Sequence, residues 1–174
     1  MTTSSPGVLA DRIATAFRPG PYQLPDGRVL DRYFDPYQLT ADPVLLRETA
    51  DALAELLPPD TQVVAGPALA GISLVTALSL RTGLPAAYVR ATPKTHGTWR
   101  QIEGADLDGR RVVLVDDTAR SGTSLLRSAR LLRMAGARVS TTVCVLDRDA
   151  GAADLLAAHR MTLAALLTDQ GGAS

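Results

Sequence analysis

The chain has 174 residues, 46% of them hydrophobic, and its 18 basic and 18 acidic residues give a net charge of zero. This length suffices for one complete hydrophobic core, and no run of about 18 uncharged apolar residues is present to cross a membrane. Zero net charge provides no field to attract nucleic acid, so no such partner is expected. The first six residues lack a basic segment followed by an apolar one, so we predict no secretory leader and a cytoplasmic location. The single cysteine, Cys144, excludes an internal disulfide.

The N-terminal segment predicts a short helix and a hairpin. Residues 7–17 carry apolar side chains at helical spacing and are followed by Pro19-Gly-Pro21, which we expect to end the helix. Residues 22–35 contain two apolar patches around a Pro-Asp-Gly turn, which is typical of a hairpin. Tyr33 and Phe34 at its end either line a site or belong to the core, and the residues alone leave both interpretations open.

The next segment predicts a helix, a strand and a second helix. Asp42-Pro43 is a strong helix start, so we expect a helix over residues 44–57. A short strand over 62–66 then leads through a tight turn, 66–71, into a helix over 72–82. A strand, a glycine-containing turn and a helix N-terminus form a common cradle for phosphate groups, and this turn ends at Gly71.

A long polar loop follows the strand predicted at residues 86–90. Residues 91–104 contain glycine and proline and exceed the usual length of a connection, which indicates a functional loop or a disordered one. Lys94 in this loop is the only lysine, beside 17 arginines. Trp99 would either anchor such a loop as a lid or simply tether it.

The most informative stretch is Val112–Ser124. Four apolar residues predict a buried parallel strand, and Asp116 and Asp117 follow it at the edge where open α/β sheets bind ligands. The loop 120–124 offers hydroxyls, backbone N–H groups and the start of a helix, expected over 123–135, to a phosphate. Acceptors for sugar hydroxyls beside a phosphate cradle indicate a sugar phosphate. A structural turn with acidic residues by chance is the alternative. A Walker B strand is not favoured, since no GxxxxGK[ST] motif is present.

The remaining elements complete an α/β pattern. A strand is expected over 138–146, followed by Asp147-Arg148-Asp149, a short helix over 152–158 and a last strand or packing segment over 161–167. Alternating strands and helices predict a single doubly wound α/β domain over residues 1–174 with a mainly parallel sheet. On the helix 123–135 we expect Met134 on the inner face with the leucines, and Arg127, Arg130 and Arg133 on a solvated face.

The stretch 112–124 resembles the 5-phosphoribosyl-1-pyrophosphate (PRPP) signature of the type I phosphoribosyltransferases. The resemblance implies that Asp116 and Asp117 hold the ribose hydroxyls, and that the loop wraps the 5′-phosphate. It also implies Mg²⁺ carried by PRPP near the two acids, with no direct metal ligand from the chain. The phosphate-binding loop is Arg120, Ser121, Gly122, Thr123 and Ser124. Thr118, Ala119 and Arg120 depart from the family's more usual aliphatic, aliphatic and threonine residues.

Within that family the chain is most similar to the orotate phosphoribosyltransferases. The resemblance implies an N-terminal hood over residues 1–37, whose Tyr33 or Phe34 stacks on the base, and a mobile catalytic loop over 91–104. Arg148 would grip the carboxylate of the acceptor. The loop residues that match are Arg90, Lys94, His96 and Gly97. The resemblance further implies a homodimer whose loop reaches the partner's site.

Three positions lack a charge that the orotate enzymes usually have, namely Pro25, Ala70 and Ala91. We therefore weigh three hypotheses. The first is an enzyme that makes orotidine 5′-phosphate from PRPP and orotate. The second is the same transfer to a different heterocycle in specialised metabolism. The third is a regulator that binds PRPP without turnover, although a regulator would have no need of Lys94 and His96.

Overall fold

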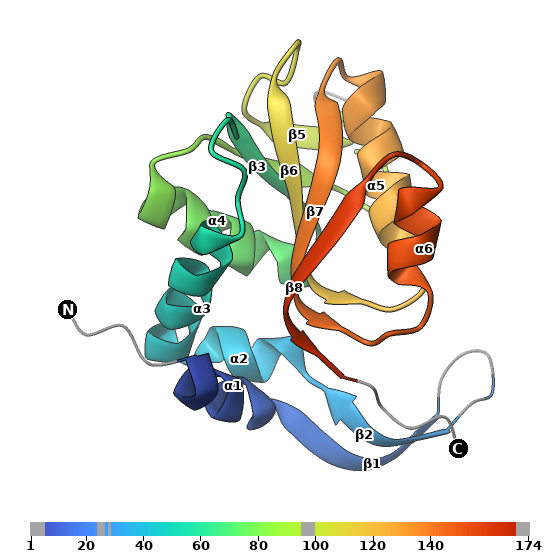
Figure 1. The fold of residues 1–174 in the computed structure, drawn as a ribbon. Coiled ribbons are helices and arrows are strands. Elements are labelled where there is room, and N and C mark those ends of the chain that lie inside the picture. Colours follow the sequence, from blue (N-terminus) through green and yellow to red (C-terminus); the bar gives the residue numbers. More distant parts are fainter. Residues whose placement is uncertain (1–5, 24–26, 28, 95–99, 170–174) are drawn as a thin grey trace.

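The computed structural model describes residues 6–23, 27, 29–94 and 100–169, and in that part of the chain it has a six-stranded sheet and a two-stranded one (Figure 1). The large sheet has the order β5-β4-β3-β6-β7-β8. Neighbouring strands are parallel except that β5 runs antiparallel to β4 at the edge. The predicted doubly wound α/β fold with a mainly parallel sheet is thus confirmed. The strands are β3 (Val63–Pro67), β4 (Ala86–Val89), β5 (Ile102–Gly104), β6 (Arg111–Ala119), β7 (Arg138–Asp147) and β8 (Thr162–Thr168).

Helices cover both faces of this sheet, and a separate apolar cluster fills each interface (Figure 1). α3 (Pro43–Glu55) and α4 (Ala70–Thr82) lie on one face, and α5 (Thr123–Met134) and α6 (Ala152–Ala157) lie on the other. The central strands are almost fully buried because helices exclude water from both sides, which explains their continuous apolar runs. No helix in the described part of the chain is long and apolar enough to span a membrane.

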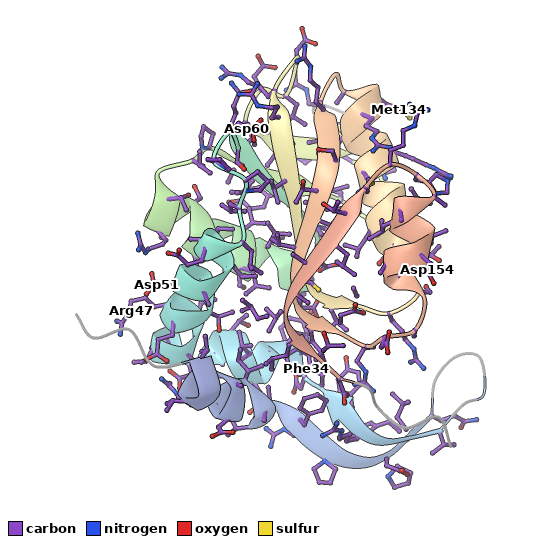
Figure 2. The ribbon with its side chains drawn as sticks, in the orientation of Figure 1. Phe34, Arg47, Asp51, Asp60, Met134 and Asp154 are labelled. Carbon is purple, nitrogen blue, oxygen red and sulfur yellow. The ribbon has the colours of Figure 1, made fainter. Side chains whose placement is uncertain are left out.

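Helix ends follow the sequence signals closely. Oδ1 of Asp42 accepts hydrogen bonds from the backbone N–H of Val44 at 2.8 Å and of Leu45 at 3.1 Å, so the predicted cap of α3 is confirmed. Gly83 ends α4 in the left-handed conformation, as expected. Met134 is exposed at the outer end of α5 (Figure 2), so its predicted inward position was wrong. It is the last residue of the helix, where packing against the sheet has ended.

The N-terminal segment forms a small unit beneath the carboxyl ends of the large sheet's strands (Figure 1). It consists of α1 (Pro6–Ala14), the antiparallel pair β1 (Phe17–Gln23) and β2 (Val29–Phe34), and α2 (Pro36–Ala41). We call the unit from α1 to α2 the hood.

Two boundaries in the hood differ from the prediction. The helix ends at Ala14, and Phe17 instead opens β1, where it pairs with Phe34 of β2. Their rings meet edge to face with centroids 5.3 Å apart, a contact that a helical Phe17 would lose. Pro19 to Pro21 lies within β1, at a register shift rather than at a helix end. The predicted turn lies almost wholly outside the described residues.

Two short elements were not foreseen. α2 follows Asp35, whose Oδ1 accepts a hydrogen bond from the N–H of Tyr37 at 3.0 Å, and it ends one residue before the cap of α3. β5 lies inside the segment predicted as a loop. Its three residues pair with β4, and such a short edge strand has too few residues to show a period.

Candidate functional site

The acidic pair lies near the carboxyl end of the central strand β6, but the strand does not stop before it. β6 continues through Asp116 and Asp117 to Ala119, which pairs with Asp147 of β7. The four apolar residues are part of a longer strand, which continues four residues beyond Val115. The two acids therefore belong to the strand rather than to a loop, and their carboxyl groups are close enough to interact.

Asp116 is a buried carboxyl group with 6% of its surface exposed. Its Oδ1 accepts a hydrogen bond from the backbone N–H of Asp117 at 3.0 Å. Burial raises the pKa of Asp116 well above its ordinary value, and the charge of Asp117 adds to the rise. A carboxyl group that is buried in this way binds a hydroxyl or a proton more readily than a carboxyl group exposed to water does.

Asp117 is half-buried and faces the hood. Its Oδ2 accepts a hydrogen bond from Oγ1 of Thr118 at 3.2 Å. Burial raises the pKa of Tyr33, with the charges of Asp117 and then Asp35 as the next causes, so the phenol of β2 lies within electrostatic reach of the acidic pair. Tyr33 is 41% exposed, and its ring centroid is 5.4 Å from that of Tyr22. The hood therefore presents an aromatic surface to the strand end.

The loop after β6 presents hydroxyls and the start of α5. Gly122 precedes α5 with φ of 75°, and no side chain caps the helix. The N–H of Thr123 donates a hydrogen bond to Oγ of Ser121 at 3.5 Å, and the next N–H groups of the first turn remain available to an anion. Oγ of Ser121 donates a hydrogen bond to Oγ1 of Thr123 at 3.1 Å, which gathers the two hydroxyls. A Cβ at Gly122 would lie 3.1 Å from Cα of Ala152, so a side chain there would press on α6 as well as strain the backbone at this positive φ.

The turn between β3 and α4 packs against the same strand end. A Cβ at Gly66 would lie 2.5 Å from the carbonyl oxygen of Val115, and one at Gly71 would lie 3.5 Å from Oδ1 of Asp116. No side chain caps α4 either. The two predicted phosphate cradles therefore lie on neighbouring strands, with Asp116 close to Gly71.

The segment predicted as a catalytic loop is partly ordered at its base. The backbone N–H of Arg90 bonds to the carbonyl of Gln101 at 2.8 Å, and that of Lys94 to the carbonyl of Arg100 at 3.3 Å. Lys94 forms an ion pair with Glu103 of β5, and this pair holds the pKa of Glu103 below its ordinary value. Lys94 is thus paired within the chain rather than directed at the acidic pair. His96 lies outside the described residues.

The two residues predicted to stack on an acceptor differ in exposure. Phe34 is 4% exposed and packs against Phe17 between the hood and the sheet (Figure 2), so of the two interpretations left open by the sequence, its burial favours the core. Tyr33 alone is accessible.

Arg148 lies just beyond β7, and its backbone N–H bonds to the carbonyl of Ala119 at 2.8 Å. Its guanidinium lies 3.6 Å from Oδ2 of Asp169. Arg32 of β2 bonds to Oδ1 of the same carboxylate at 2.5 Å. Sequence reasoning missed Arg32 and Asp169 because no local motif marks a contact between residues 137 positions apart. It missed Glu103 because the position of that side chain depends on the pairing of β5 with β4.

Among the described residues, no three side chains of His, Cys, Asp or Glu gather in a way that could hold a metal ion. Two adjacent carboxylates suit a hydrated Mg²⁺ that keeps most of its water and phosphate ligands.

Comparison with known proteins gives consistent results. A family model for the phosphoribosyl transferase domain matches residues 38–164. The orotate phosphoribosyltransferase of Nocardioides sp. is 40% identical over 141 residues, covering 81% of this chain and 79% of the relative. That of Halobacterium salinarum is 38% identical over 168 residues, covering 97% and 95%. The crystal structure of Mycobacterium tuberculosis H37Rv orotate phosphoribosyltransferase with Fe(III) dicitrate has a TM-score of 0.83 at 30% identity, and the match covers 94% and 95%.

Proposed function

The chain belongs to the phosphoribosyl transferase family, and from this membership we propose that it transfers the phosphoribosyl group of PRPP to orotate, giving orotidine 5′-phosphate and pyrophosphate. The observation that carries the proposal is the juxtaposition at the end of β6 of a buried acid, a second acid and an uncapped helix start. These groups match the ribose hydroxyls and the 5′-phosphate of PRPP in charge and hydrogen bonding.

We assign the PRPP contacts as follows. Asp116 and Asp117 accept hydrogen bonds from the ribose hydroxyls, and the hydroxyls and N–H groups from Ser121 to Ser124 bind the 5′-phosphate, with Arg120 beside them. Gly71 and the start of α4 approach the pyrophosphate, because the turn lies against Asp116. Mg²⁺ carried by PRPP near the two acids would neutralise part of the pyrophosphate charge.

The chemistry explains the need for cations in the loop 91–104. Displacement of pyrophosphate from C1 passes through an oxocarbenium-like state, in which negative charge departs with the leaving group. Arg90 and Lys94 supply positive charge for that group, and His96 supplies a proton donor. Lys94 must leave Glu103 to do so, which makes the ion pair a resting position. A closed loop would also exclude water that hydrolyses PRPP.

On the acceptor side, Tyr33 stacks on the heterocycle and Arg148 binds its carboxylate. Both lie at the carboxyl end of the sheet, Tyr33 in the hood and Arg148 beside the end of β6. The chain acts as one domain that includes the hood, in the cytoplasm, as a homodimer in which the loop 91–104 reaches the partner's site.

A different heterocycle is the second candidate for the acceptor. The absence of a charged side chain at Pro25, Ala70 and Ala91 favours it, because these positions flank the two substrates in the orotate enzymes that the chain resembles. Reduced positive charge would weaken the advantage of an anionic acceptor.

The experiment measures pyrophosphate release from PRPP and Mg²⁺ by the purified protein with orotate, uracil, purines and other heterocycles in turn. We expect release with orotate and little with the others. Release with another heterocycle alone would replace orotate by the second candidate. A protein that binds PRPP but releases no pyrophosphate with any acceptor would be a PRPP-binding regulator.

A further inference from the structure

A carboxylate of the chain itself lies between two arginines beside the proposed acceptor site. Oδ1 of Asp169 accepts a hydrogen bond from Arg32 of the hood at 2.5 Å, and Oδ2 lies 3.6 Å from Nη1 of Arg148. The side chains of Asp169 and Arg148 are only 10% and 14% exposed. One negative charge is therefore held next to Arg148 in a largely buried place.

The contact between Asp169 and Arg148 is electrostatic rather than a hydrogen bond. A separation of 3.6 Å exceeds hydrogen-bonding distance, and Oδ2 is buried without a hydrogen-bond donor in the part of the chain that the structure describes. Arg32 fixes the carboxylate through its other oxygen. Asp169 thus affects Arg148 through charge and does not orient its guanidinium.

Arg148 keeps its place through other contacts. Its backbone N–H bonds to the carbonyl of Ala119, and its guanidinium lies 5.9 Å from the ring centroid of Phe17. Loss of the charge at Asp169 should therefore leave Arg148 where it is and raise the positive potential around it. Little solvent screens the pair, so the effect would extend to a ligand that contacts Arg148.

We propose that Asp169 sets the acceptor preference of the site by offsetting the charge of Arg148, so that carboxylated heterocycles gain less over uncharged ones than Arg148 alone would give them. The inference rests on the proposed role of Arg148 and deepens it. Asp169 acts through Arg148 and touches neither substrate.

The test replaces Asp169 by Asn, which keeps the shape and removes the charge. We expect Asp169→Asn to lower the KM for orotate about fivefold, to leave the KM for PRPP within about twofold, and to change uracil binding little. Asp169→Glu should restore the KM of the parent protein. Asp154→Asn removes an exposed carboxylate on α6 (Figure 2) and should change none of these values.

A double substitution shows whether the effect passes through Arg148. In an Arg148→Ala background, Asp169→Asn should no longer lower the KM for orotate. An unchanged KM for orotate in Asp169→Asn alone would overturn the proposal. A raised KM would overturn it too, by showing that Asp169 positions Arg148.

Calorimetry of orotate and uracil binding separates this proposal from the proposed function, because binding needs no turnover. Tighter orotate binding by Asp169→Asn, in a protein that releases no pyrophosphate with orotate, would leave the inference standing and reject the function. Equal orotate binding by the two proteins would reject the inference whatever the turnover.

Discussion

At the scale of single residues, Asp116 is held at a cost to stability. Its raised pKa means that the native state binds more protons than the unfolded chain between the two pKa values, so stability falls as the pH rises from the unfolded value through the folded one. Above that window the wild-type protein bears the full cost of a buried charge. A ligand whose hydroxyl groups donate hydrogen bonds to the carboxylate would offset that cost.

Asp116→Asn should therefore stabilise the free protein while weakening PRPP binding. Asn can still accept the N–H of Asp117 through Oδ1, and it carries no charge. We expect a higher Tm than that of the wild type near pH 7.5, with a difference that closes as the pH falls toward about 3, where the carboxyl group is protonated in both states. Thermal unfolding followed across this pH range measures it, with the exposed Asp154→Asn as the control. A lower Tm for Asp116→Asn, or a difference in Tm that does not change with pH, would contradict the conclusion that the buried charge of Asp116 destabilises the protein.

Residue roles were predictable from the sequence where a motif is local. Asp116, Asp117 and the loop 120–124 lie within nine positions and reveal a strand, a turn and a helix start together. The ion pair of Lys94 with Glu103 and the cluster around Asp169 depend on which strands pair and on where the hood lies. The burial of Phe34 depends on Phe17, which the helical pattern placed in a different element.

At the scale of elements, the junction of β6, the phosphate loop and α5 depends on Gly122. Its positive φ and its close approach to Ala152 of α6 both disfavour a side chain. Gly83 matches it closely in φ, at 73°, but has open space around it. A comparison of substitutions at these two glycines therefore separates the cost of backbone strain from the cost of steric contact.

Gly122→Ala should cost about 2–4 kcal/mol of unfolding free energy, against about 1 kcal/mol for Gly83→Ala. It should also raise the KM for PRPP, because relief of the contact with Ala152 moves the loop. Urea unfolding and PRPP saturation of both variants check this. Equal losses of stability in the two would show that the contact with α6 is unimportant.

The elements that sequence patterns missed are the short ones. α2 has six residues and β5 has three, and both are too brief for periodicity to show. Their positions come from caps and from pairing with β4, which are features of the folded chain. The long helices and central strands were predictable because a buried face repeats over several turns or residues.

At the scale of the whole molecule, the proposed dimer makes a prediction about Lys94 and Asp117. If Lys94 acts in the partner's site, Lys94→Ala and Asp117→Asn are complementary defects. A mixed dimer then has one intact site and one doubly damaged site, and random mixing makes half of the dimers mixed. Co-refolding the two inactive variants should restore about a quarter of wild-type activity. No recovery after verified subunit exchange would place Lys94 in its own subunit's site.

The central claim is that the strand end of β6 binds PRPP for transfer to orotate. The most direct measurement quantifies orotidine 5′-phosphate and pyrophosphate formed from PRPP, Mg²⁺ and orotate by the wild-type protein and by Asp117→Asn. We expect equal amounts of the two products from the wild type, and a large joint loss of turnover and PRPP affinity in Asp117→Asn, while Asp154→Asn behaves as wild type. Unaltered kinetics in Asp117→Asn, or pyrophosphate formed without orotidine 5′-phosphate, would contradict it.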